Sequence, residues 1–457
     1  MDTGSGDSDK GCFMRSIPRV VIAGTESGCG KTSVASGLMA AFRERGLTVQ
    51  PFKTGPDFID PTHHTRICGR TSRNLDPFMM GEEGVLRTFV YASAGADIAV
   101  VEGAMGLFDG IDGSDFSSTA HVARILKAPV VLVISAAASA RSVHAVVRGF
   151  RDFDPRVRIA GVIFNRLATT KHRDMIAAEE FVPALGYIPR QQGPGVQSRH
   201  LGLVMAHESD GMQSYGQVVR ESCDLDAILA VARSALPLAG PGFAMAKKAE
   251  NRAVIGVARD NAFCFYYQDN LDRLARAGAE LRFFSPMDDA LPEMDALYLG
   301  GGYPELYTGE LEASPCRNTI RDLAEQGMPI YGECGGLMYL GRAISTDREY
   351  QMVGILPACT EMTSRIQALG YVKGTFSGPA VFWAGGSQVL GHEFHFSRTE
   401  CDPDARFALR LGQGTGIHDG NDGLTEQNTV GTYTHTYFSD TFCEQFVTAA
   451  EAFRRNR

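Results

Sequence analysis

The sequence predicts an α/β protein with two parallel-sheet domains, and three observations support this fold class. Its 457 residues exceed what one hydrophobic core usually holds together. Apolar, β-branched runs recur along the chain, each followed by a glycine-rich turn and then by a helical pattern. These runs are continuous rather than alternating, which is typical of parallel strands covered by helices on both faces.

The first half of the chain repeats this strand, turn and helix unit. Residues 20–23 lead into a glycine-rich loop, and residues 33–45 then have the pattern of a helix. Three further runs follow the same scheme, at residues 98–101, 130–134 and 161–164. Ligands of such sheets bind at the carboxyl ends of the strands, which is where the motifs described below fall.

The pattern breaks at residues 234–251, where Ala, Pro and Gly dominate, and restarts at residues 253–258. We therefore predict four segments: a disordered N-terminal tail (1–16), a first α/β domain (17–235), a linker (236–251) and a second α/β domain (252–457). The first domain is expected to carry an extra lobe around residues 170–235.

Composition and charge exclude several classes of protein. The net charge is -9 and no dense Lys/Arg run is present, which argues against nucleic acid or an anionic membrane as a partner. No run approaches the roughly 20 apolar residues that span a bilayer, and the polar N-terminus lacks the order of a signal peptide. The ten cysteines include no CxxC pair, which argues against a zinc site or a disulfide scaffold. We expect a cytoplasmic protein.

Residues 24–32, Gly-Thr-Glu-Ser-Gly-Cys-Gly-Lys-Thr, match a phosphate-binding loop except that Thr25 stands where the first glycine is expected. Backbone N–H groups of such a loop cradle phosphates at a helix N-terminus. We expect the lysine to reach the β- and γ-phosphates of ATP and the final threonine to bind Mg²⁺. The predicted nucleotide-binding residues of the loop are Thr25, Gly28, Gly30, Lys31 and Thr32.

Two further loops carry paired carboxylates. Glu102 follows the run at 98–101, and Asp109 lies in the glycine-rich segment after it. We predict that both serve the nucleotide site, because acidic residues there bracket a loop that follows a buried strand. Asp57 and Asp60 lie three residues apart between two prolines. A capped turn is the alternative to the favoured interpretation, a loop that binds a second Mg²⁺ and orients the transferring phosphoryl group.

The predicted Mg²⁺ ligands are Thr32, Asp57 and Glu102. Lys53 lies near these loops in sequence and is interpreted either as a contact for substrate carboxylates or as a surface charge. His63 and His64 are expected to line the substrate at most.

Cys334 is the predicted nucleophile of the second domain. It stands between glycines directly after the apolar run 328–331, as on a sharp strand-to-helix turn. A helix N-terminus and a nearby histidine would favour its thiolate. The loop after residue 299 is glycine-rich, and we expect an oxyanion hole from the backbone N–H groups of Gly301, Gly302 and Gly335.

His435 is the preferred base because it ends a strand-like run near the C-terminus, and His392 or His395 is the alternative. A thiol that can form an acyl-enzyme and an ATP site in one chain favour an amide-forming enzyme. Such an enzyme takes nitrogen from L-glutamine and activates a carboxylate with ATP.

From about residue 17 onwards, the chain resembles the cobyrinic acid a,c-diamide synthase family. The motifs that carry the resemblance are residues 24–32, 52–61, 101–110, 300–306, 332–336, 391–396 and 434–435. The resemblance implies a dethiobiotin-synthetase-like ATP domain followed by a class I glutaminase domain. It further implies that ATP phosphorylates two acetate carboxylates of a tetrapyrrole in turn, and that ammonia from glutamine displaces each phosphate.

The resemblance implies that Asp57, Asp60, Glu102 and Asp109 are the carboxylates of the metal, phosphoryl and substrate loops. It makes Cys334 the nucleophile with His435 as its base. The wider glutaminase class often has Glu two residues after this histidine, but Tyr437 stands there. Either another group such as Glu393 orients His435, or the pair acts as a dyad.

The substrate remains open between cobyrinate, which leads to cobamides, and nickel sirohydrochlorin, which leads to coenzyme F430 in methanogenesis. The phosphate and glutamine motifs do not distinguish these tetrapyrroles. A different class of function is a partitioning or nucleotide-switch ATPase. Such proteins carry a signature lysine where Glu26 stands, and they would not need Cys334. The expected partner is a small-molecule tetrapyrrole, and a homodimer is compatible with this expectation.

Overall fold

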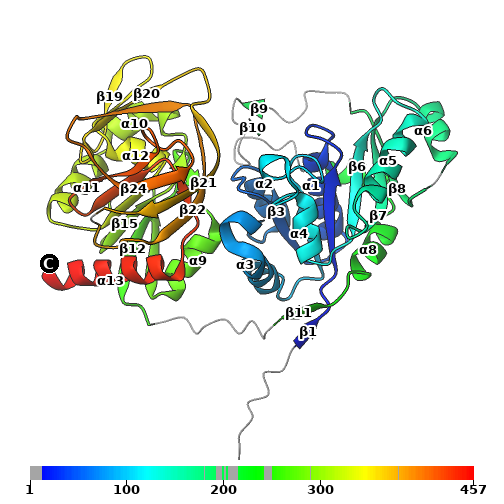
Figure 1. Cartoon of the computed structure of the whole chain (residues 1–457), viewed down its shortest axis with the longest axis horizontal. Coiled ribbons are helices and arrows are strands. Elements are labelled where there is room, and N and C mark those ends of the chain that lie inside the picture. Colours follow the sequence, from blue (N-terminus) through cyan, green and yellow to red (C-terminus); the bar gives the residue numbers. More distant parts are fainter. Residues whose placement is uncertain are drawn as a thin grey trace, which may run out of the picture. The chain divides into compact units, whose positions relative to one another are not determined.

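The computed structural model describes residues 13–179, 181–191, 198–199, 202–203, 215–240, 250–288, 290–378 and 380–457. Internal contacts divide the chain into two units, residues 1–245 and 246–457 (Figure 1). Each unit is described by itself. The predicted tail lies outside the described residues up to position 12, and so do residues 241–249 of the predicted linker.

The first unit contains a seven-stranded, fully parallel sheet in the order β4-β3-β5-β2-β6-β7-β8. Its strands are β2 (Arg19–Gly24), β3 (Val49–Thr54), β4 (Arg73–Leu75), β5 (Ile98–Glu102), β6 (Val130–Ser135), β7 (Ile159–Leu167) and β8 (Ala184–Pro189). Two short antiparallel pairs accompany it: β1 (Phe13–Arg15) with β11 (Leu238–Gly240), and β9 (Ser198–Arg199) with β10 (Gly202–Leu203).

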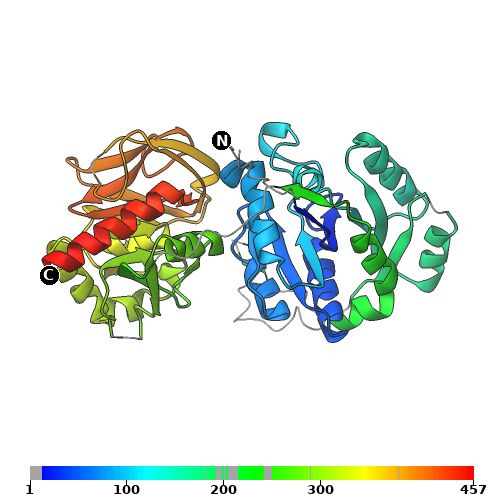
Figure 2. The same cartoon turned by 90° about the horizontal axis from the view of Figure 1, so that it is seen from below.

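Helices cover both faces of this sheet (Figure 2). They are α1 (Lys31–Glu44), α2 (Asp60–Cys68), α3 (Pro77–Ala92), α4 (Thr119–Ile125), α5 (Ser142–Phe153), α6 (Thr170–Ala177), α7 (Tyr215–Ser222) and α8 (Leu225–Arg233), with the short 3₁₀ turn η1 (Ile111–Gly113).

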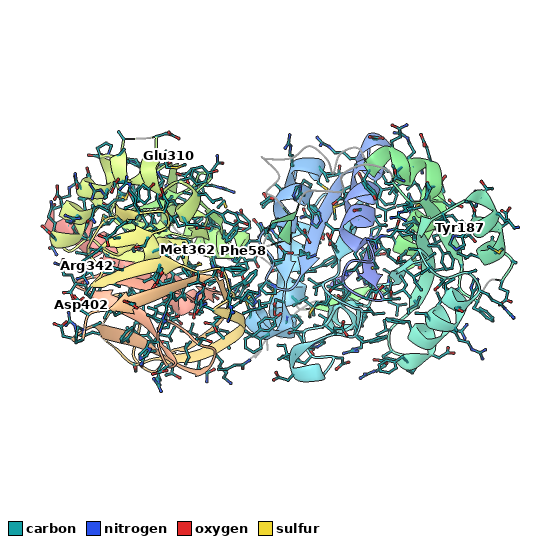
Figure 3. The ribbon with its side chains drawn as sticks, turned by 90° about the horizontal axis from the view of Figure 1, so that it is seen from above. Phe58, Tyr187, Glu310, Arg342, Met362 and Asp402 are labelled. Carbon is teal, nitrogen blue, oxygen red and sulfur yellow. The ribbon has the colours of Figure 1, made fainter. Side chains whose placement is uncertain are left out.

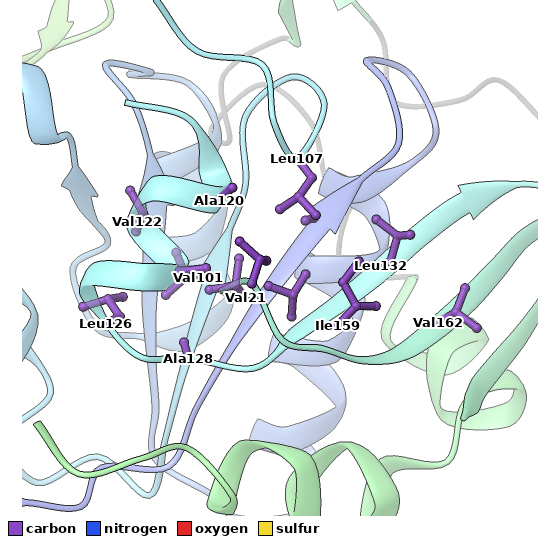
Figure 4. Close-up of a cluster of buried hydrophobic side chains, with 14 of the residues drawn as sticks. Val21, Val101, Leu107, Ala120, Val122, Leu126, Ala128, Leu132, Ile159 and Val162 are labelled. Atoms are coloured by element: carbon purple, nitrogen blue, oxygen red, sulfur yellow. The ribbon is translucent and has the colours of Figure 1, made fainter. Parts of the chain in front are cut away.

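Alternate residues of each strand enter two different cores. Val21 of β2 packs with Val101, Leu132 and helix α4 on one face (Figure 4). Val20 and Ile22, which stand on either side of Val21 in the strand, pack against α1 on the other face. Because successive side chains point to opposite faces, a strand buried on both sides must be apolar throughout. The continuous apolar runs of the sequence therefore have a physical cause, and the predicted fold class is confirmed.

The second unit is built on a ten-stranded mixed sheet in the order β14-β12-β15-β17-β26-β25-β24-β21-β22-β27. The first five strands are parallel and the rest pair antiparallel. Their bounds are β12 (Ala253–Ala258), β14 (Ala279–Phe284), β15 (Ala296–Leu299), β17 (Ile330–Glu333), β21 (Ala368–Phe376), β22 (Gln388–His395), β24 (Arg406–Gln413), β25 (Asn421–Glu426), β26 (Thr429–Thr432) and β27 (His435–Thr436).

The antiparallel half departs from the strand, turn and helix scheme of the sequence, because its strands follow one another through loops. A second, four-stranded sheet contains β18 (Ala343–Ser345), β19 (Glu349–Gln351), β20 (Ala358–Met362) and β23 (Ser397–Cys401). At its surface Arg342 Nη1 donates to Asp402 Oδ2 at 2.8 Å (Figure 3). A short pair joins β13 (Phe263–Phe265) to β16 (Gly301–Gly302).

The helices of this unit are α9 (Gln268–Arg276), α10 (Thr308–Ala313), α11 (Cys316–Glu325), α12 (Gly335–Leu340) and α13 (Asp440–Asn456), with the 3₁₀ turn η2 (Pro304–Leu306). Side chains of α9 and α13 share one core with β12 and β15, whereas α11 and α12 pack on the other face. Within the described ranges, no helix combines the length and the apolar character needed to cross a membrane.

Candidate functional site

The phosphate loop of the first unit connects the end of β2 to the start of α1. Gly28 and Gly30 adopt positive φ angles of 79° and 102°, which favours glycine at both positions. Thr25 is not among the residues with positive φ. A side chain at Gly24 would instead lie 2.4 Å from Cys29 Sγ. The position where the sequence pattern expects a glycine therefore tolerates Thr25, because the close approach occurs at Gly24.

Lys31 begins helix α1, and its Nζ donates a hydrogen bond to the Glu26 carbonyl oxygen at 3.0 Å. Burial lowers the pKa of Lys31, because a charged amine is less well solvated there. The ammonium is therefore held against the backbone of the phosphate loop.

Glu102, at the end of β5, is the centre of a buried polar cluster. Its Oε1 accepts hydrogen bonds from Thr32 Oγ1 at 2.6 Å and from Lys53 Nζ at 2.8 Å. Its Oε2 lies 2.7 Å from Nε2 of His64 on α2. Burial alone would raise the pKa of Glu102, but the Lys53 charge and the His64 hydrogen bond outweigh it and lower this pKa. The structure thus brings together Thr32 and Glu102, as the sequence predicted.

Lys53 is buried, so its interpretation as a surface charge is wrong. Its Nζ lies 2.6 Å from Asp60 Oδ2 and 3.8 Å from Asp57 Oδ2, in addition to its bond with Glu102. These three carboxylates outweigh the effect of burial and raise the pKa of Lys53. Register explains the meeting, because Lys53 of β3 pairs directly with Glu102 of β5. Strand β3 mixes apolar residues with Gln50, Lys53 and Thr54, so the sequence carried no clear signal that Lys53 is buried.

Asp57 forms the capped turn that the sequence analysis kept as an alternative. Its Oδ1 accepts the backbone N–H groups of Ile59 at 2.7 Å and Asp60 at 3.2 Å. Burial, together with the negative charge of Asp57, raises the pKa of Asp60. Lys53 therefore contacts three carboxylates, and one of them, Glu102, also contacts His64.

Asp109 occupies a different position from the other carboxylates. Its Oδ2 accepts the Gly106 N–H at 2.9 Å, and it is solvent-exposed. The loop that carries it is tied to the phosphate loop, because the Leu107 N–H donates to the Gly24 carbonyl oxygen at 2.8 Å. Asp109 is therefore held beside the nucleotide loop by backbone contacts.

Oxygen donors dominate this centre, which suits a hard cation such as Mg²⁺. Among the residues that the structure describes, no group of three or more His, Cys, Asp and Glu side chains is arranged to hold a metal. Mg²⁺ commonly takes only one or two carboxylates from the protein and completes its shell with phosphate and water. The Thr32 hydroxyl and the Glu102 carboxylate, whose oxygens lie 2.6 Å apart, fit that pattern. Asp57 is linked to them through Lys53.

In the second unit, Cys334 stands on a sharp turn between β17 and α12. Its φ of 49° and ψ of -100° are strained for a residue with a side chain. The Cys334 N–H donates to the Thr432 carbonyl oxygen at 2.6 Å. A Cβ at Gly336 would lie 2.4 Å from the Leu299 carbonyl oxygen, and one at Gly332 would lie 2.6 Å from Leu340 Cδ1. Glycines on both sides are therefore needed for this turn.

His435 and the predicted oxyanion glycines converge near this turn. His435 is buried, and a Cβ at Gly301 would lie 2.4 Å from its Cε1 atom. A Cβ at Gly335 would lie 3.2 Å from the Gly302 backbone nitrogen. Burial disfavours the charged ring, but hydrogen bonds and charge from Cys334 and Glu333 outweigh it and raise the pKa of His435 to about 9.

The two alternative histidines lie on β22. His392 pairs opposite His435, and burial, reinforced by His435, lowers the pKa of His392 to about 3. His395 Nδ1 donates to the Ser397 carbonyl oxygen at 2.8 Å, and its ring stacks on Tyr433 at 3.6 Å. Burial lowers the pKa of His395 to about 4. The geometry favours His435 as the partner of Cys334.

Glu393, suggested by the sequence as the group that orients His435, binds the backbone of another loop. Its two carboxylate oxygens accept backbone N–H groups from Thr415 at 2.6 Å and Gly416 at 2.9 Å. Sequence reasoning missed Glu333, whose Oε2 lies 3.9 Å from His435 Nδ1. The signal was its place directly before Cys334, at the carboxyl end of a buried strand.

Comparison with known proteins gives a consistent result for both units. Residues 20–198 match the model of the CobQ/CobB/MinD/ParA nucleotide binding domain, and residues 254–441 match that of the CobB/CobQ-like glutamine amidotransferase domain. Three curated relatives share the name cobyrinate a,c-diamide synthase. The Methanosarcina barkeri protein is 42% identical over 97% of this chain and 98% of its own. The Archaeoglobus fulgidus protein is 44% identical over 92% of this chain and 94% of its own. The Syntrophotalea carbinolica protein is 44% identical over 93% of this chain and 96% of its own.

Proposed function

The chain belongs to the cobyrinate a,c-diamide synthase family, and from this premise we propose that it amidates the a and c acetate carboxylates of a tetrapyrrole. It is a glutamine-dependent amide ligase with a nucleotide-binding domain and a glutamine amidotransferase domain. The observation that supports the proposal is the presence of two candidate sites in one chain. One is the phosphate loop with its carboxylate cluster, and the other is the cysteine turn with His435.

In the second unit, His435 takes the thiol proton of Cys334, and the thiolate attacks the side-chain amide carbon of glutamine. The Gly301, Gly302 and Gly335 backbone N–H groups would stabilise the oxyanion. Ammonia leaves with the proton from His435, and a thioester remains on Cys334. Water then hydrolyses this thioester to glutamate and restores the thiol.

In the first unit, an acetate oxygen attacks the γ-phosphorus of ATP, which forms an acyl phosphate and releases ADP. Lys31 and the loop N–H groups hold the phosphates. Mg²⁺ would be held by Thr32, Glu102 and Asp57, and it would neutralise charge on the transferring group. Asp60, held by Lys53, keeps the loop that faces the substrate in place. Ammonia then attacks the acyl carbon, and inorganic phosphate leaves.

The substrate we favour is cobyrinate, because the relatives that cover nearly the whole chain carry its name. Nickel sirohydrochlorin, which would place the enzyme in coenzyme F430 synthesis, is the competing substrate. Both present acetates on a reduced tetrapyrrole rim. A nucleotide-switch ATPase is disfavoured because it has no use for the amidotransferase domain.

A competition experiment tests this assignment. Cobyrinate and nickel sirohydrochlorin are offered together with ATP, Mg²⁺ and glutamine, and the amidated products are followed by mass spectrometry. Preferential formation of cobyrinate diamide is the expected result. Preferential amidation of nickel sirohydrochlorin would reassign the substrate, and amidation of neither would overturn the tetrapyrrole proposal.

A further inference from the structure

The residue two positions after His435 does not orient the imidazole. The Tyr437 hydroxyl donates to Asp269 Oδ2 at 3.2 Å and accepts from Arg273 Nη2 at 3.2 Å. The Arg273 guanidinium also lies 5.0 Å from the centre of the Tyr437 ring. The Tyr437 side chain therefore contacts helix α9. The group that orients His435 must come from elsewhere in the fold.

Glu333 occupies the position of such a group. It is the last residue of β17 and pairs with Thr432, three residues before His435. Its carboxylate is buried, as is the His435 ring, and Oε2 lies 3.9 Å from His435 Nδ1. A carboxylate on the Nδ1 side leaves Nε2 for the thiol, which is the division of roles that a nucleophile, base and orienting group require.

Two hydrogen bonds fix the Glu333 carboxylate. Oε1 accepts the Thr436 backbone N–H at 3.0 Å, and Oε2 accepts the Tyr298 hydroxyl at 3.0 Å. Thr436 directly follows His435, so the carboxylate is bonded to the same strand that carries the imidazole. A carboxylate oxygen can accept more than one hydrogen bond, and Oε2 can therefore still receive one from Nδ1.

The charges around His435 point the same way. The titratable groups that face it are Cys334 and Glu333 from the β17–α12 turn, and His392 and His395 from β22. Burial lowers the pKa of His392 to about 3 and that of His395 to about 4, so both are neutral near pH 7. The Glu333 carboxylate thus lies 3.9 Å from Nδ1 of an imidazole whose pKa is raised to about 9.

We propose that Glu333 is the positioning residue of the glutaminase site, and that it holds His435 with Nδ1–H toward Oε2 and Nε2 toward Cys334. The inference rests on the proposed role of Cys334 and His435. Glu333 stabilises the imidazolium that forms when the thiol proton moves to Nε2, until that proton leaves with ammonia.

The test compares Glu333→Gln with the unaltered protein. Glutamine hydrolysis should fall by between about tenfold and 10⁴-fold, the larger figure being the effect of an Asp-to-Asn change in a serine protease triad. Amidation driven by free ammonia should stay unchanged, because that reaction bypasses the thiol. A diazoketone analogue of glutamine alkylates the thiol, and the rate of this reaction is followed from about pH 6 to pH 10. In Glu333→Gln the fall of this rate at high pH should begin at a lower pH than in the unaltered protein.

Glu393→Gln is the matched control. It is another buried carboxylate of the same sheet, but it binds the backbone of Thr415 and Gly416. Its alkylation profile should match that of the unaltered protein. Tyr298→Phe provides a second variant if Glu333→Gln does not fold. Loss of one of the two hydrogen bonds to Glu333 should reduce glutamine hydrolysis by a smaller factor and leave ammonia-driven amidation intact.

A folded Glu333→Gln protein with an unchanged hydrolysis rate and alkylation profile would overturn the inference. If only Tyr298→Phe folds, an unchanged rate of glutamine hydrolysis in that variant would overturn it. Failure of the proposed function itself gives a different result. In that case Cys334→Ala would still hydrolyse glutamine, whatever residue stands at position 333.

Discussion

Both units bury a group that can carry a positive charge, but they differ in the number of carboxylates that lie beside it. In the first unit Lys53 contacts Asp57, Asp60 and Glu102, so negative groups outnumber the one lysine in the cluster. In the second unit His435 faces one carboxylate, Glu333, and one thiol. The first cluster is organised around one buried ammonium, whereas the second is organised around one buried imidazole. The difference predicts that the first unit is sensitive to the loss of positive charge and the second to displacement of one ring.

The largest expected effect comes from Lys53→Met. Removal of the ammonium leaves Asp60 and Glu102 buried without their common partner, which typically destabilises a protein by about 3–5 kcal/mol. Amidation should be lost with either glutamine or ammonia as nitrogen source. Circular dichroism melts and product assays check both effects. Lys171→Met, an exposed lysine of the same unit, is the control. Lys53→Met with the stability of that control would contradict the shared-lysine account.

Gly301→Ala should reduce only the glutamine-dependent reaction. Its new methyl group would lie 2.4 Å from His435 Cε1, so the ring has to move. A misplaced base of this kind lowers the rate by about 10²-fold, while ammonia-driven amidation continues. Gly385→Ala is the matched control, since nothing lies within 4 Å of its added carbon. Equal glutaminase rates for the two variants would show that His435 does not depend on this contact.

A pH titration of stability examines the second cluster directly. The pKa of His435 is raised from 6.5 to about 9, which corresponds to about 3 kcal/mol of stabilisation. A raised folded pKa gives stability that is fully present below pH 6.5 and is lost as the pH rises through about 9. The stability advantage over His435→Gln should shrink across that window. Fluorescence of Trp383, the one tryptophan, reports unfolding of this unit in urea. An advantage that stays constant with pH would contradict the assignment.

The smallest effect is expected at the surface of the second unit. Arg342 and Asp402 form a solvent-exposed ion pair with an Nη2 to Oδ1 distance of 2.5 Å. Exposed pairs contribute about 0.2–1 kcal/mol. Arg342→Ala should therefore change the urea midpoint only slightly and leave both reactions intact. A double-mutant cycle with Asp402→Ala measures the coupling, and a value well above this range would show that the pair has a larger structural role.

The comparison also explains what could be predicted from the sequence. The phosphate loop and the cysteine turn depend on local backbone geometry that requires glycine at positions such as Gly30 and Gly336. These glycines made both motifs recognisable in the sequence. Lys53, His64 and Glu333 could not be placed in the same way. Their roles depend on which strands are neighbours, such as β3 beside β5 and β17 beside β26.

The same limit applied to the fold. Continuous apolar runs predicted the parallel strands, because burial on both faces requires them. The antiparallel strands of the second unit alternate in burial, as β22 does with every second residue buried. Such strands follow no helix and do not repeat the predicted unit, so their number and order had to come from the structure.

The most direct test of the central claim, two separate reactions in one chain, is to assay Cys334→Ala and Lys31→Ala side by side with glutamine and with ammonia. The account predicts that Cys334→Ala loses glutamine-dependent amidation but keeps ammonia-dependent amidation, whereas Lys31→Ala loses both. Loss of both activities in a folded Cys334→Ala protein, or synthesis retained by Lys31→Ala, would contradict it.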